Sequence, residues 1–72
     1  MTVTEYKQYF FVITIETDGG SVSLASILNA GPKSTAQARY EAAYRAVCER
    51  TRAKKFYVPD NAAVIFYSCE PN

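Results

Sequence analysis

The chain has no histidine and no tryptophan, and only two cysteines. Histidine is the commonest general base and the commonest metal ligand in proteins, so most hydrolytic and metal-dependent sites lose their usual component. Two thiols alone cannot complete a four-ligand zinc site, and Cys48 and Cys69 have no base spaced to activate them. We therefore predict no catalytic residues, no metal site and no cofactor, and expect a protein that is not an enzyme.

Long apolar runs are also missing. The longest are Tyr9 to Ile13 and Ala62 to Tyr67, far below the roughly 20 residues that span a bilayer. Met1 to Lys7 lacks a charged region followed by an apolar one, so we predict no secretory signal. The expectation is a cytoplasmic protein with reduced cysteines and no membrane partner.

Strong net charge is absent as well. Eight basic and seven acidic side chains leave a net charge of +1, which exerts no overall attraction on nucleic acid or acidic substrates. With 49% hydrophobic and 14% aromatic residues, the chain is too apolar to be disordered. Its 72 residues suffice for one core, so residues 1–72 are predicted to form a single domain.

The first half of the chain has the pattern of a β-hairpin. Side chains alternate over Lys7 to Thr17, Asp18-Gly19 suits a two-residue type I′ loop, and Gly20 to Leu28 continues as an extended segment. This loop places Ile13 opposite Leu24. A slip of the loop by one residue, to Gly19-Gly20, would change the opposing residues but leave both faces of the hairpin the same.

The second half has the pattern of a helix and a strand. Ser34 and Gln37 fit a capping box, and Tyr40, Tyr44 and Val47 recur at helical spacing. Ala62 to Cys69 is apolar on both faces and is predicted to be the last strand.

These elements predict an α+β fold. The domain is a two-layer β-β-α-β arrangement whose three-stranded sheet is mostly antiparallel, with one helix on one face. Spatial order 2-1-3 is preferred because the first strand is the longest and is apolar even on its poorer face, whereas order 1-2-3 would place the last strand beside the second in parallel. The helix is predicted to cover the face formed by Tyr9, Phe11, Ile13, Ile15, Val22 and Leu24.

One helix leaves the other face of this sheet uncovered. The last strand must add either Val64 with Phe66 or Ile65 with Tyr67 to that face. The predicted interface consists of Phe10, Val12, Ala25, Ile27, Val64 and Phe66. Exposed apolar patches usually mark interaction surfaces, so we expect a protein-interaction module that forms a homo-oligomer, most simply a dimer. Another protein could occupy the face instead, or Tyr57 and the N-terminal segment could fold over it.

Basic residues gather near the predicted end of the helix. Arg45 to Lys55 holds five basic residues and one acid. Arg50, Arg52, Lys54 and Lys55 could contact phosphates while Phe56 and Tyr57 stack on bases, which is the usual combination in single-strand binding. A solvated helix end that complements the helix dipole explains the same charges, and the near-neutral total favours it.

The tail carries the one family resemblance. Phe66-Tyr67-Ser68-Cys69-Glu70-Pro71-Asn72 resembles the ends of small uncharacterised proteins of actinobacteria and their phages, which finish in aromatic-aromatic-Ser-x-Glu-Pro-Asn. The resemblance covers the general order of the chain but few specific residues, and Cys69 stands where a larger aliphatic residue is expected. It implies a compact domain of bacterial or phage origin, and no activity.

Overall fold

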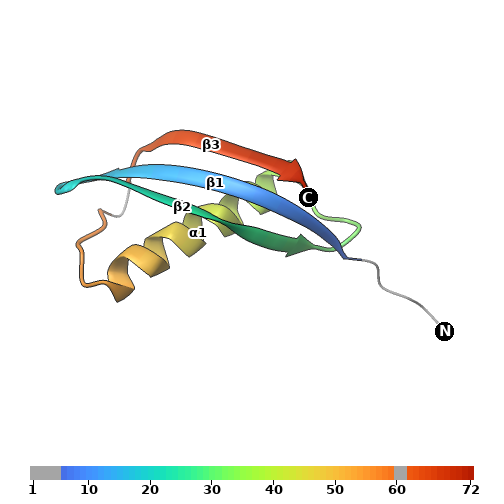
Figure 1. The fold of residues 1–72 in the computed structure, drawn as a ribbon, viewed down its shortest axis with the longest axis horizontal. Helices are drawn as coiled ribbons and strands as arrows, with labels where there is room; N and C mark the ends of the chain where they lie inside the picture. The colour runs from blue at the N-terminus through green and yellow to red at the C-terminus, as the bar shows by residue number, and fades with distance from the viewer. Residues whose placement is uncertain (1–5, 60–61) are drawn as a thin grey trace.

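The computed structural model describes residues 6–59 and 62–72. The elements are β1 (Lys7–Thr17), β2 (Gly20–Ala30), α1 (Ala36–Ala53) and β3 (Val64–Pro71). Figure 1 shows the three strands as one curved layer and α1 as a second layer on one side of it. The predicted α+β fold is therefore confirmed.

The sheet has β1 at its centre. The strand order is β2-β1-β3 and both pairings are antiparallel, which confirms the preferred order and excludes a parallel third strand beside β2. In the hairpin Ile13 lies opposite Leu24, as predicted, and Thr17 lies opposite Gly20 at the turn.

The type I′ turn is wrong, although the loop position is right. Of the described residues, only Gly20 (φ 123°) and Lys55 (φ 66°) have positive φ, so neither Asp18 nor Gly19 adopts the conformation that a type I′ turn requires. The positive φ lies one residue beyond the predicted loop, at Gly20, the first residue of β2. Glycine adopts it without a Cβ clash. The Thr17 hydroxyl closes the turn by donating to the Gly20 carbonyl at 2.8 Å.

The core lies between the sheet and α1. Phe11, Ile13 and Ile15 point from β1 into this layer and are buried. Other buried members come from α1 and from the segments before β3: Ala43, Val47, Cys48, Val58 and Ala62. The helix covers the predicted face, since Val47 is part of this cluster and Tyr44 packs against it. Tyr40 makes a contact that the sequence did not predict, with its ring edge-on to that of Tyr67 at a centroid distance of 4.9 Å.

The helix begins one residue later than the predicted capping box. Thr35 is the N-cap, with extended backbone (φ −100°, ψ 161°), and its hydroxyl accepts from the Ala38 amide at 3.0 Å. Ser34 instead accepts a hydrogen bond from the Arg39 guanidinium at 2.9 Å, and Gln37 donates to Glu41. Either of two neighbouring hydroxyl residues can cap a helix. Here Arg39 binds Ser34, and Thr35 is the N-cap.

Candidate functional site

The sheet face opposite α1 carries the predicted interface. Cross-strand pairs define its rows: Phe10 lies between Ile27 and Glu70, and Val12 lies between Ala25 and Ser68. The next row places Thr14 between Ser23 and Phe66. We call Phe10, Val12, Ala25, Ile27 and Phe66 the open sheet face.

Large apolar side chains on this face are exposed to solvent. Phe10 is 44% exposed, Ile27 51% and Phe66 54%. They follow a diagonal across the three strands, from Ile27 through Phe10 and Val12 to Phe66. Polar groups border this diagonal, because the Thr14 and Ser23 hydroxyls share a hydrogen bond at 2.6 Å and Glu70 stands directly opposite Phe10. The result is an exposed apolar stripe. The Thr14 and Ser23 hydroxyls beside it bond to each other and do not cover it.

Val64 does not belong to this face, and its predicted place beside Phe66 is wrong. The register between β1 and β3 shifts between Thr14 and Ile15, so that Phe66 lies opposite Thr14 while Val64 lies opposite Ile15. Ile65 is the extra residue of this β-bulge, and the bulge turns Val64 to the helix side, where it packs against the core.

Coverage of the open sheet face by Tyr57 is not seen. Tyr57 is 68% exposed and lines a hollow with Arg52 and Lys55 beyond the end of α1. The N-terminal part of that alternative concerns residues 1–5, which lie outside the described residues. Among the described residues, the apolar side chains of this face remain open to water.

The basic residues at the end of α1 form a second surface. Arg50, Arg52, Lys54 and Lys55 are all exposed. They divide between two hollows: Arg50 and Lys54 line one that lies between α1 and β2, and Arg52 and Lys55 line the other together with Tyr57. Phe56 lines both hollows. The predicted candidates therefore lie around one aromatic side chain.

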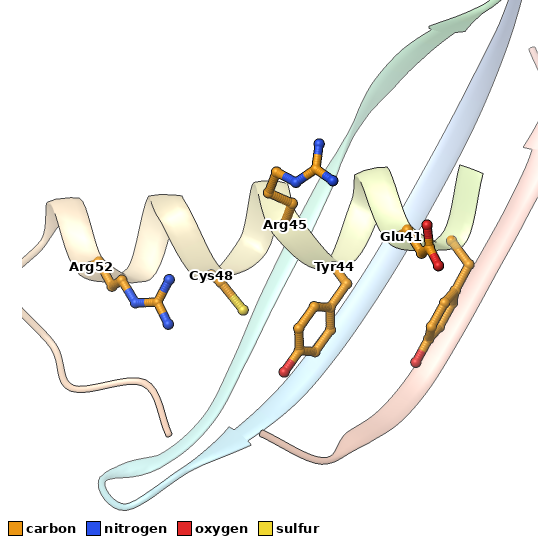
Figure 2. A pocket seen from close by; sticks show the side chains of 6 residues that line it. Glu41, Tyr44, Arg45, Cys48 and Arg52 are labelled. Carbon is orange, nitrogen blue, oxygen red and sulfur yellow. The ribbon is translucent and has the colours of Figure 1, made fainter. Parts of the chain in front are cut away.

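Sequence reasoning missed a cavity of about 360 Å³ along α1. Its lining consists of Tyr40, Glu41, Tyr44, Arg45, Cys48 and Arg52. Tyr44, Cys48 and Arg52 project from the same side of the helix (Figure 2). The repeat of every fourth residue, with a step from a large tyrosine to a small cysteine, is the signal that could have located it.

Two phenols have raised pKa values: that of Tyr44, which lines this cavity, and that of Tyr67, which packs against the cavity residue Tyr40. Burial, together with the neighbouring Cys48, raises the pKa of Tyr44. Burial and the Cys69 thiol likewise raise the pKa of Tyr67 to about 12, against the opposing effect of Arg39. The Tyr44 hydroxyl donates to the Ala62 carbonyl at 3.2 Å. Both phenols therefore stay protonated, so Tyr44 donates a hydrogen bond and Tyr67 packs, and neither acts as a base.

Comparisons with protein-family models, with curated proteins and with solved structures found no match. Within the described residues, no helix has the length and apolar character needed to cross a membrane. The same residues contain no group of three or more Cys, Asp or Glu side chains placed to hold a metal ion.

Proposed function

We propose that this protein is a non-enzymatic interaction module that self-associates as a two-fold dimer through its open sheet face. The observation that carries the proposal is the exposure of Phe10, Ile27 and Phe66 on a sheet face that no helix of the described residues covers. Burying apolar surface contributes about 25 cal/mol per Å² to stability. A small domain buries a smaller fraction of its surface on folding, so burial in a dimer interface adds proportionately more to its stability than to that of a large domain.

A second copy of the chain is the occupant we favour. Closed two-fold pairing is the commonest way in which a protein covers one apolar patch with its own copy. The polar border suits an interface of this kind, because Ser23 and Thr14 already satisfy one another and enter it without losing partners. A cytoplasmic location belongs to the same proposal, since Cys48 and Cys69 are free thiols of the kind found in reducing compartments.

The test is the mass of the protein in solution. Light scattering on a sizing column should give at least twice the chain mass of 8.0 kDa for the parent. Phe10→Lys should shift the mass to that of a monomer, because the lysine, even beside Glu70, loses its hydration when it is buried in an interface. Lysine is preferable to glutamate here, since Glu70 lies directly opposite and like charges would weaken the sheet itself.

A matched control separates the face from general surface effects. Phe56→Lys makes the same chemical change at a similarly exposed phenylalanine on the helix side, and it should leave the dimer intact. A parent that is monomeric at every concentration contradicts the proposal. A dimer that survives Phe10→Lys moves the interface elsewhere, with the free edges of β2 and β3 the next candidates.

A further inference from the structure

Phe56 forms a shared wall between two cationic hollows at the C-terminal end of α1. The hollow between α1 and β2 has a volume of about 330 Å³ and contains Arg50 and Lys54. The second has a volume of about 640 Å³ and contains Arg52, Lys55 and Tyr57. Among the described residues, neither lining includes a carboxylate. Phe56 therefore borders two hollows, each of which contains two positively charged side chains.

The aromatic side chains at this place are unusually open. Phe56 is 61% exposed and the adjacent Tyr57 is 68% exposed. Exposed rings beside cations match one class of ligand well, because unpaired bases stack on ring faces while the phosphates between them meet lysine and arginine. Bases of a duplex are stacked on each other and cannot take that position.

We propose that this end of the molecule binds single-stranded nucleic acid across Phe56. One base stacks on Phe56 and a neighbouring base on Tyr57. The flanking phosphates enter the two hollows and contact Arg50 with Lys54 on one side and Arg52 with Lys55 on the other. The attraction is local, since the whole chain carries a net charge of only +1.

This surface meets the open sheet face only along β2, where Ala25 and the neighbouring Ser23 also line the hollow that contains Arg50 and Lys54. The end of α1 and the segment that follows it lie on the helix side of the sheet (Figure 1). A dimer joined through the open sheet face leaves the hollow of Arg52, Lys55 and Tyr57 accessible and presents two copies of it. Stacking on Phe56 and Tyr57 and the contacts with Arg52 and Lys55 therefore do not depend on whether the protein self-associates.

Fluorescence anisotropy of a labelled oligothymidine of about 12 nucleotides provides the test. Titrations are made at about 50 mM and about 200 mM salt, with a duplex of equal length and an acidic peptide as competitors. We expect saturable binding that weakens steeply with salt and is displaced poorly by either competitor. Phe56→Ala should weaken binding at least about fivefold, because stacking on one ring is worth that much or more.

Charge-matched variants distinguish the site from net charge. Arg52→Gln with Lys55→Gln should weaken binding about tenfold and lower the slope of log Kd against log salt by about 1.4. Lys33→Gln with Arg45→Gln removes the same charge away from both hollows and should change Kd less than about threefold. Absence of binding at low salt overturns the proposal. Equal losses in the two charge-matched variants, or full competition by the acidic peptide, overturn it too, because either result describes a general anion surface.

Discussion

Lys55 occupies a backbone conformation that usually belongs to glycine. Its φ is 66°, immediately after the helix C-cap at Lys54. The Lys55 amide donates to the Arg52 carbonyl at 2.8 Å and the Phe56 amide donates to the Thr51 carbonyl at 3.2 Å. These two bonds form a Schellman motif, which ends the helix and sets the direction of Phe56. The left-handed conformation disfavours any residue with a Cβ by about 1–2 kcal/mol.

Replacing this lysine with glycine should stabilise the fold. Lys55→Gly relieves the steric conflict but adds freedom to the unfolded chain, so we expect a net gain of about 0.5–1 kcal/mol in the free energy of unfolding. Urea denaturation measures it. Lys54→Gly is the matched control, because Lys54 has a negative φ of −87° and should gain nothing. A Lys55→Gly variant that is no more stable than the parent contradicts this account of the helix end.

Tyr67 links β3 to the helix through a phenol that resists ionisation. Its ring packs edge-on against Tyr40, and burial raises its pKa to about 12 from an ordinary 10.0. The folded state therefore holds its proton more tightly than the unfolded state does. Stability from this group is complete below pH 10 and is lost as the pH rises toward 12.

Alkaline unfolding should consequently depend on this hydroxyl. The parent's free energy of unfolding should fall between pH 10 and 12, and Tyr67→Phe, which keeps the ring and removes the proton, should show a smaller fall. Urea titrations at a series of pH values give both curves. Tyr57→Phe makes the same change at an exposed ring and should follow the parent. Identical curves for the parent and Tyr67→Phe would assign the loss to other groups.

The β-hairpin was predictable because two independent signals in the sequence agree. Alternation places Phe11, Ile13 and Ile15 on one face, and the Asp18-Gly19 loop determines which residues of β2 lie opposite them. Turn type was not predictable in the same way. It depends on which glycine takes the positive φ, and Gly19 and Gly20 are both available.

The sequence does not predict which side chains of the last strand face the helix. Residues 62–69 are apolar at nearly every position, so their periodicity does not tell which side chains face the helix. The bulge at Ile65 changes the facing partway along, and only the pairing with β1 reveals it. Of the predicted interface, the part on the hairpin could be derived from the sequence, whereas the contribution of β3 could not.

Two substitutions at the start of α1 test which of the adjacent hydroxyl residues, Ser34 or Thr35, caps the helix. Thr35 accepts from the Ala38 amide, so Thr35→Ala should cost about 1 kcal/mol, within the usual range of about 0.5–2 for an N-cap. Ser34→Ala removes only the contact with Arg39 and should cost less. Thermal unfolding of the two variants compares them directly. A larger loss at Ser34 would restore the capping box that the sequence suggests.

Within residues 6–59 and 62–72, one helix lies on a three-stranded sheet and gives it one buried face and one open face. Ile13 and Ile15 are fully buried on the first, whereas Phe10 and Ile27, on neighbouring strands, are about half exposed on the second. The architecture itself therefore determines that β1, the central strand, carries apolar side chains on both sides. A domain of this kind is stabilised further when a second layer covers the open face.

Self-association should make the melting temperature depend on protein concentration. Dimerisation stabilises only the folded chains, and each tenfold rise in concentration adds about 1.4 kcal/mol per dimer, or about 0.7 per chain. For a domain of 72 residues this corresponds to about 3–5 °C per tenfold step above the dissociation constant. Phe10→Lys should melt at one temperature throughout the series, while Phe56→Lys should retain the dependence of the parent. Circular dichroism melts over a hundredfold range of concentration would reveal it, and a parent whose melting temperature stays constant over that range would mean that the open sheet face is not covered by a second copy.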